Sequence, residues 1–136
     1  MYIKQIYTNC LSQASYYIES GDECVIIDPI RDIDDYKTLI NSRKTKLIYV
    51  LETHFHADFV SGHLELSNKY NCPIVYGPNA NTNYNSISLK DGELLSIGKV
   101  KMQIIHTPGH TLESVSYLLL DEENKQHSLY TGDTLF

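Results

Sequence analysis

Apolar and polar residues alternate along the first part of the chain with the period of β-strands. Residues 3–7, 14–19 and 23–28 are rich in Ile, Val and Tyr. Gly21-Asp22 lies between the second and third of these segments and is typical of a tight turn. The pattern therefore predicts a meander of short antiparallel strands, rather than a parallel crossover, at the start of the fold.

Two later segments have the spacing of helices, with one strand between them. Asp32 or Asp34 can cap the first helix, and its apolar face is formed by Ile33, Tyr36 and Ile40. The second helix opens at Ser61-Gly62 and runs roughly to Tyr70. Its apolar contacts are expected from Val60, Leu64, Leu66 and Tyr70. Residues 46–51 show almost no polar alternation, which predicts a buried strand in the centre of a sheet.

The second half of the chain is again typical of strands and loops. Strands are predicted at residues 73–76, 100–106, 114–120 and 128–131. Loops or turns are predicted at residues 77–86, 89–93 and 107–111. The order of elements predicts a mixed α+β class, and the length of 136 residues suits one domain at most.

Composition narrows the possible partners. The net charge of -6 argues against binding to nucleic acid or to an anionic membrane surface, because both require a basic footprint. No apolar run approaches the roughly 18 residues of a membrane span. The start of the chain lacks the apolar core of a signal peptide, so a cytoplasmic location is expected. The three cysteines are widely spaced and predict neither a metal site nor disulfides.

Polar residues that can bind a metal follow three of the predicted strands. His54, His56 and Asp58 come directly after residues 46–51, His110 follows the strand that ends near His106, and Asp133 follows residues 128–131. Loops at one edge of a layered sheet are where reactive side chains gather, because the strands hold them rigidly. Imidazole and carboxylate ligands together suit zinc or iron. We therefore expect a metal centre built from these loops.

These motifs, in this order, resemble those of the metallo-β-lactamase superfamily: Thr53-His54-Phe55-His56-Ala57-Asp58, then Thr107-Pro108-Gly109-His110-Thr111, then Thr131-Gly132-Asp133. The resemblance implies an αββα sandwich with metal between two sheets. It also implies that residues 1–136 form only about the first two-thirds of such a domain. We therefore expect a C-terminally truncated, partial domain.

A finer resemblance is to the persulfide dioxygenase branch of that superfamily, especially bacterial forms fused to rhodanese domains. It is carried by residues 28–32, 51–66 and 76–80. It implies one Fe(II) per chain, held by His54, His110 and Asp133, which would also be the catalytic centre. His56 and Asp58 would orient ligands or a bound water, or serve as alternative metal ligands. No substrate-binding residue is assigned.

The implied reaction oxidises a low-molecular-weight thiol persulfide, such as glutathione persulfide, with O2 to sulfite and the parent thiol. Two imidazoles and one carboxylate on one face leave open positions of the kind that mononuclear Fe(II) uses for a substrate and oxygen. A C-terminal rhodanese domain is a possible partner in the full-length protein.

Two other functions stay open. One is a dinuclear zinc hydrolase of the same fold, similar to hydroxyacylglutathione hydrolase, in which bridged metals activate water. Such enzymes commonly carry a histidine after the motif aspartate, and this chain has Phe59 there. The other is a non-catalytic module or inactive fragment, because an incomplete sheet with an open edge is prone to need a partner.

Overall fold

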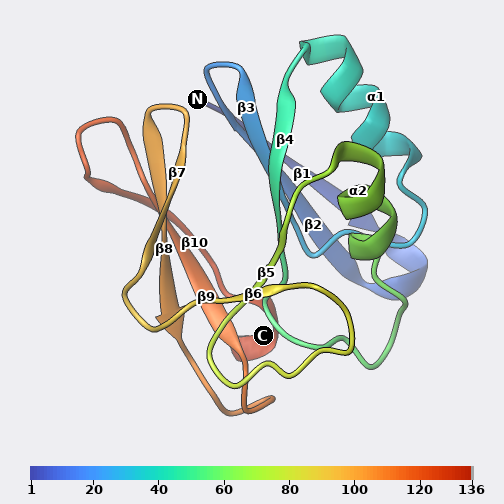
Figure 1. Ribbon diagram of the computed structural model, residues 1–136, viewed down its shortest axis with the longest axis vertical. Helices are drawn as coiled ribbons and strands as arrows, with labels where there is room; N and C mark the ends of the chain where they lie inside the picture. The colour runs from blue at the N-terminus through green and yellow to red at the C-terminus, as the bar shows by residue number, and fades with distance from the viewer. Residues whose placement is uncertain (136) are drawn as a thin grey trace.

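The computed structural model describes residues 1–135 and consists of two β-sheets that face each other, with helices on the outer side of one (Figure 1). The first sheet has six strands, in the order β1 (Tyr2–Thr8), β2 (Gln13–Ser20), β3 (Glu23–Ile27), β4 (Lys46–Leu51), β5 (Ile74–Tyr76) and β6 (Ile87–Ser88). The short 3-10 turn η1 (Asn9–Leu11) joins β1 to β2.

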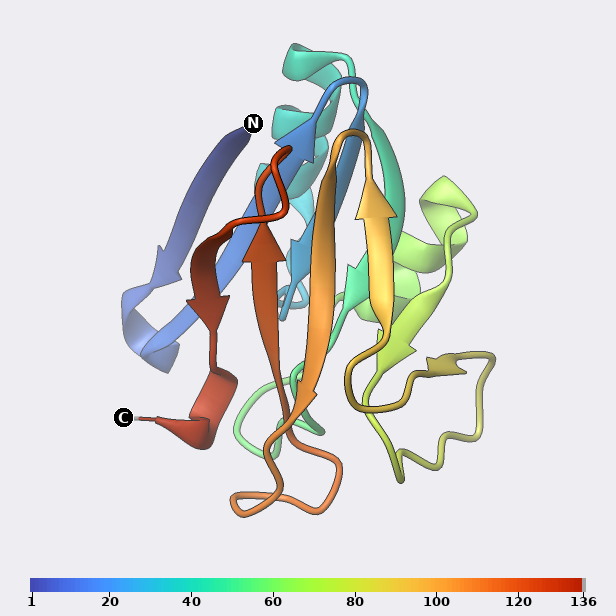
Figure 2. The ribbon, with the colours of Figure 1, turned by 90° about the vertical axis from the view of Figure 1, so that its left-hand side faces the viewer.

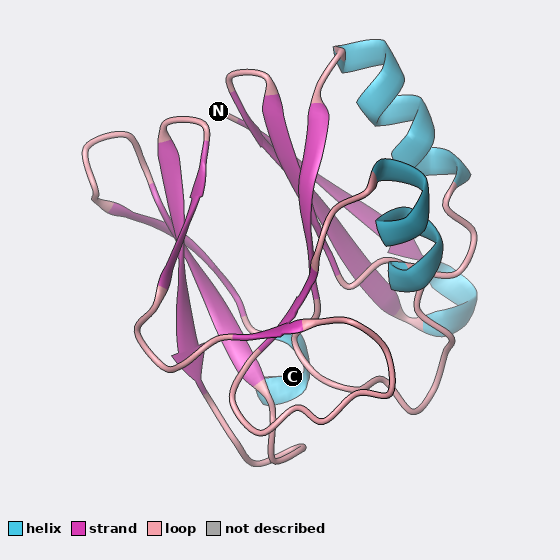
Figure 3. Ribbon diagram, in the orientation of Figure 1, coloured by secondary structure: helices cyan, strands magenta, loops and turns pink. Residues whose placement is uncertain are grey.

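The second sheet is antiparallel throughout and is seen face-on in Figure 2. Its strands lie in the order β10 (Gln126–Tyr130), β9 (Val115–Leu120), β8 (Val100–His106) and β7 (Leu94–Ile97), and the 3-10 turn η2 (Gly132–Thr134) follows β10. The helices α1 (Asp34–Arg43) and α2 (His63–Tyr70) both cover the face of the first sheet that points away from the second (Figure 3). Neither helix is long or apolar enough to cross a membrane.

Strands β3 and β4 are covered on both faces, which explains their nearly continuous apolar sequence. Alternate residues of β3 enter two different cores. Val25 and Ile27 pack between the two sheets, whereas Cys24 and Ile26 pack against the helices with Tyr36 of α1. Because successive side chains of a strand point to opposite faces, this strand holds both layers together.

Several predictions from the sequence are confirmed. Strands β1, β2 and β3 form the expected antiparallel meander. Strand β4 lies inside its sheet, parallel to both β3 and β5. Tyr36 and Ile40 are the buried residues of α1, as expected. The expected cap by Asp32 or Asp34 is wrong, because the N-cap residue is Ile33 and no side chain caps the helix, although the Asp34 amide donates to Asp32 Oδ1 at 3.1 Å. Within residues 1–135, two sheets face each other and both helices lie on the outer face of the first sheet, which agrees with the expected α+β class.

Other predictions were wrong in detail. The second helix has Gly62 as its N-cap and runs from His63 to Tyr70, as expected, but Leu66 is its buried residue. Val60 and Leu64 do not supply apolar packing, since they are 62% and 43% exposed. Strand β7 was missed because its alternation of exposed and buried residues spans only four positions after a turn.

A glycine turn locks the two sheets together at the end opposite the predicted metal site. Gly98 joins β7 to β8 with φ of +53°, and its Cα faces the Ser20 carbonyl at the end of β2 so closely that a Cβ would overlap it. The Gly98 amide donates to Glu23 Oε2 at 2.7 Å, and the Lys99 amide donates to Ser20 Oγ at 3.0 Å.

We predict that Gly98→Ala lowers the free energy of unfolding more than Gly21→Ala does. Both glycines have positive φ, but Gly21 faces open space, so it carries only the backbone penalty. Overpacking against Ser20 should add about 1–3 kcal/mol. Chemical denaturation of the two variants measures the difference, and equal stabilities would show that the turn does not press on β2.

Candidate metal centre

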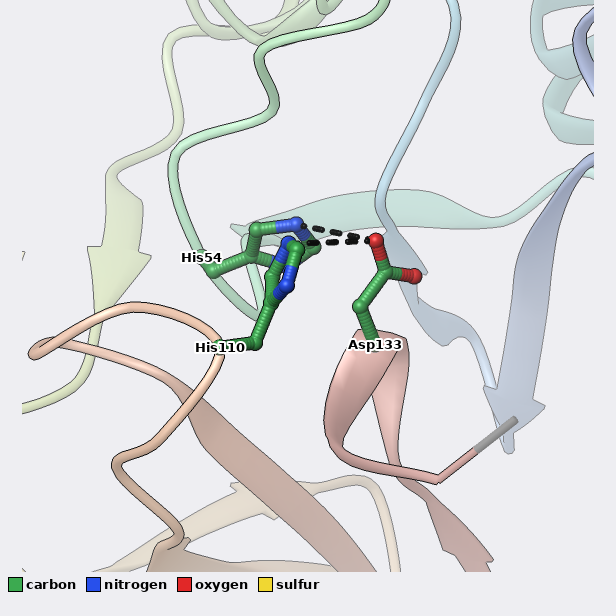
Figure 4. Close-up of side chains that lie close together, drawn as sticks. All are labelled: His54, His110 and Asp133. Atoms are coloured by element: carbon green, nitrogen blue, oxygen red, sulfur yellow. Dashed lines mark ion pairs between the residues drawn. The ribbon is translucent and has the colours of Figure 1, made fainter.

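Three side chains from distant parts of the chain converge on one point (Figure 4). Asp133 Oδ2 lies 3.5 Å from His54 Nε2 and 3.4 Å from His110 Nε2. One ligand atom from each residue lies within 4.8 Å of the other two. Two ligands bound at about 2.1 Å to one ion lie about 3 to 3.5 Å apart, so the three residues fit a single metal ion.

The fold brings these residues together because three loops leave the same edge of the sandwich. His54 follows β4, His110 lies in the loop between β8 and β9, and Asp133 lies in η2 after β10. The two sheets therefore contribute ligands from both sides. The first loop is also tied to the second, since the Phe55 amide donates to the buried carboxylate of Glu113 at 2.8 Å and the Val115 amide donates to the Thr53 carbonyl at 2.9 Å.

The surroundings of His54 favour the neutral form that a metal ligand needs. It is only 2% exposed, and its Nδ1 lies 2.9 Å from Thr53 Oγ1. Burial lowers the pKa of His54, and the neighbouring His56 lowers it further. A neutral imidazole has a lone pair available for a metal.

His56 lies next to His54 but belongs to a second cluster. Its Nε2 lies between Asp28 Oδ1, at 3.0 Å, and Glu52 Oε2, at 3.2 Å. Both contacts are within the range of an ion pair with a protonated imidazole. Burial alone would lower the pKa of His56, but the two carboxylates outweigh it and raise the pKa to about 10. Without a metal, the cluster thus favours a charged imidazolium. The ligand atoms of Asp28, Glu52 and His56 also lie within 4.8 Å of one another, so these residues form a second group that could hold an ion.

Glu52 is held at the centre of this second cluster. Burial would raise the pKa of its carboxyl, but His56, His63 and the Ser61 hydroxyl lower it. Ser61 Oγ donates to Glu52 Oε1, and His63 Nδ1 lies 3.4 Å from the same oxygen. The Tyr117 hydroxyl donates to the Glu52 carbonyl at 2.7 Å, which anchors this position from the second sheet.

The remaining motif residues offer little to a second metal. Asp58 is exposed and lies outside both groups of candidate ligands found in the described residues. Phe59 packs its ring on His56, with ring centroids 4.4 Å apart. The roles expected of His56 and Asp58 as ligand-orienting groups stay predictions, although His56 is placed beside the three ligands and Asp58 is not.

Sequence reasoning did not single out Asp28, Glu52 or Thr53. Asp28 and Glu52 each follow a buried parallel strand directly, β3 and β4, and these strands are neighbours. A carboxylate at the end of each of two adjacent buried strands is a signal that they meet. The sequence shows a carboxylate after each of the two strands, but only the parallel pairing of β3 with β4 shows that the two carboxylates lie close together.

A cavity of about 270 Å³ opens beside His54. Aromatic side chains line much of it, namely Phe55, Phe59, Tyr76 and Tyr84. A larger cavity of about 540 Å³ lies between α2 and residues 84–87 and contains none of the three converging ligands. Of these two cavities, the smaller one adjoins the candidate metal centre. A third cavity, of about 190 Å³, reaches the centre from the side of Asp133 and Thr53.

A family model described as "Metallo-beta-lactamase superfamily" matches residues 8–136. The chain belongs to the metallo-β-lactamase superfamily. This confirms the fold expected from the three motifs. Membership of the superfamily and the converging donor set together imply that this site holds a metal.

Individual relatives point to more than one member of the superfamily. The chain is 38% identical over 93 residues to a hydroxyacylglutathione hydrolase of Rhodopseudomonas palustris. This alignment covers 67% of the chain and 35% of the hydrolase. A metallo-beta-lactamase structure from Staphylococcus aureus aligns with a TM-score of 0.92 and 34% identity over 100% of this chain and 44% of that one.

A further structural neighbour is ETHE1 from Myxococcus xanthus. It aligns with a TM-score of 0.80 and 28% identity, over 88% of this chain and 54% of that chain. The chain thus spans about a third of the length of the hydrolase and about half that of the two solved structures.

We predict that Gly132→Ala weakens metal binding at least tenfold, whereas Gly109→Ala does not. Gly132 has φ of +51° and lies so close to Thr53 that a Cβ would overlap its side chain, so alanine must displace Asp133, Thr53 or both. Gly109 is next to His110 but faces open space. Competition for Zn²⁺ with a chromophoric chelator measures both affinities. Equal affinities would mean that the contact between Gly132 and Thr53 does not position the ligands.

Proposed function

We propose that this chain carries the metal centre of a mononuclear iron persulfide dioxygenase. One Fe(II) would be held by His54, His110 and Asp133. The reaction would be RSSH + O2 + H2O → RSH + SO3²⁻ + 2H⁺, in which the outer sulfur is oxidised by four electrons and O2 is reduced. A following rhodanese domain and a cytoplasmic location stay predictions from the sequence.

The observation that carries this proposal is Phe59, which follows the motif where two-metal enzymes of this fold commonly carry a histidine. Phe59 offers no ligand atom and Asp58 is exposed, while His56 belongs to a separate group of candidate ligands with Asp28 and Glu52. A one-metal site with two imidazoles and one carboxylate suits Fe(II) with open positions. The likeness to ETHE1, a persulfide dioxygenase, supports the same reaction.

The residues of the chain would have separate tasks in this reaction. Bound Fe(II) would supply the redox chemistry and adjacent open positions for O2 and the persulfide sulfur. His54, after β4 of one sheet, and Asp133, after β10 of the other, would hold the ion from two sides. Phe55, Phe59 and Tyr76 form an aromatic wall beside it that would exclude water from the reacting sulfur.

A second candidate is a zinc-dependent thioester hydrolase. The observation that favours it is that the sequence relatives are named hydroxyacylglutathione hydrolase, at up to 38% identity. Such a reaction would use metal-bound water as the nucleophile. The missing donor at position 59 weighs against a two-metal form of it.

Oxygen consumption by the protein distinguishes the two candidates. After anaerobic loading with Fe(II), we expect about one iron per chain and rapid O2 uptake when glutathione persulfide is added. A glutathione thioester should not be hydrolysed by the same preparation. Two tightly bound zinc ions together with thioester hydrolysis, and no O2 uptake by the iron-loaded protein, would overturn the proposal in favour of the hydrolase.

We predict that His110→Ala abolishes metal binding, whereas His56→Gln retains it within about tenfold. His110 contributes a ligand atom, but His56 faces Asp28 and Glu52, and a glutamine amide can still donate to those carboxylates. Metal content after gel filtration, with circular dichroism as the folding control, measures both. If a folded His56→Gln variant loses the metal as completely as His110→Ala, His56 is itself a ligand and the assigned set is wrong.

A further inference from the structure

Three buried residues form a chain of polar contacts that ends on the metal ligand His54. The Thr53 amide donates to Asp28 Oδ1 at 2.7 Å, and the Thr53 hydroxyl donates to Asp28 Oδ2 at 2.6 Å. The same hydroxyl oxygen lies 2.9 Å from His54 Nδ1. All three residues are at most 4% exposed, so water does not compete for these positions.

The direction of each proton follows from counting donors. An ionised aspartate can only accept, and a threonine hydroxyl has one proton to give. Thr53 gives that proton to Asp28, so its oxygen can act toward His54 only as an acceptor. The hydrogen bond between Thr53 and His54 therefore requires a proton on His54 Nδ1, which leaves the lone pair on Nε2.

We propose that Asp28 and Thr53 are positioning residues that fix the tautomer of His54, presenting its Nε2 lone pair to the metal. The inference depends on His54 being a metal ligand, as in the proposed function. It does not depend on which reaction the metal performs. In metal sites of this kind, the group that binds the remote ring nitrogen sets both ring orientation and ligand basicity.

The fold leaves the Thr53 hydroxyl little freedom to turn elsewhere. The Val115 amide donates to the Thr53 carbonyl, so the backbone is held from β9. Gly132, next to Asp133, lies so close to the Thr53 side chain that a Cβ at this position would overlap it. Asp28 has a positive φ of +49°, which is uncommon for a residue with a side chain, and its amide donates to the Leu51 carbonyl at 2.9 Å. This backbone aims the carboxylate at the start of the histidine motif.

Asp28→Asn provides a sharp test because it should reverse the direction of the hydrogen bonds between residue 28, Thr53 and His54. The buried Thr53 amide still needs an acceptor, so the asparagine oxygen takes the place of Oδ1 and its NH2 group faces the Thr53 hydroxyl. The hydroxyl must then donate to His54 Nδ1, which moves the ring proton to Nε2. Thr53→Val removes the contact altogether, and Thr53→Ser keeps it.

The tautomer can be read by long-range ¹H–¹⁵N NMR of the metal-free, full-length protein labelled at histidine, at about pH 8. We expect the Nδ1–H form of His54 in the native protein and in Thr53→Ser. We expect the Nε2–H form in Asp28→Asn and loss of the Nδ1–H preference in Thr53→Val. An Nε2–H form in the native protein, or an unchanged tautomer in both altered variants, would overturn the inference.

Metal affinity gives a second readout. Thr53→Val and Asp28→Asn should bind Zn²⁺ about 10–100-fold more weakly, and Thr53→Ser should bind it normally. His54→Ala is the control for the metal centre itself. If His54→Ala leaves binding intact, the proposed site fails. If it abolishes binding while a folded Thr53→Val variant keeps both tautomer and affinity, only the role of Asp28 and Thr53 fails.

Discussion

The loop that carries the histidine motif depends on one buried carboxylate, that of Asp28. Asp28 follows β3, accepts two hydrogen bonds from Thr53 after β4, and lies 3.0 Å from His56 Nε2. A buried aspartate needs such partners, because an unpaired charge in the interior costs several kcal/mol. The requirement to satisfy Asp28 therefore determines where the histidine motif begins and which way it leaves the sheet. The second sheet then brings His110 and Asp133 to a loop that is already placed.

The same carboxylate separates two neighbouring histidines that look equivalent in the sequence. His54 is buried among groups that keep it neutral, whereas His56 faces Asp28 and Glu52, which favour its charged form. Two rings with centroids 4.2 Å apart thus acquire opposite chemical characters from their surroundings. The two histidines accordingly belong to different groups of candidate ligands, His54 with His110 and Asp133, and His56 with Asp28 and Glu52.

Much of this architecture could be predicted from local pattern. The meander, the central strand β4 and the three loops that carry His54, His110 and Asp133 all follow from short-range periodicity and motif order. The roles of Asp28, Glu52 and Thr53 could not be predicted, because they depend on the register between β3 and β4. Val60 and Leu64 were expected to be buried from apolar spacing, but Val60 precedes α2 and both side chains are exposed. Apolar spacing alone does not tell which side of a short helix faces the sheet.

The position of Gly132 against Thr53 has a consequence for folding. The residues that meet there, Thr53 with its neighbour His54 and Gly132 with its neighbour Asp133, are almost eighty positions apart and belong to different sheets. The metal site therefore cannot exist until the sandwich has closed. Any ion bound there stabilises the closed state over the open one, by about 2.7 kcal/mol when its free concentration is a hundred times its Kd. The ion would then link the two sheets, and the free energy of unfolding would increase with the concentration of free metal.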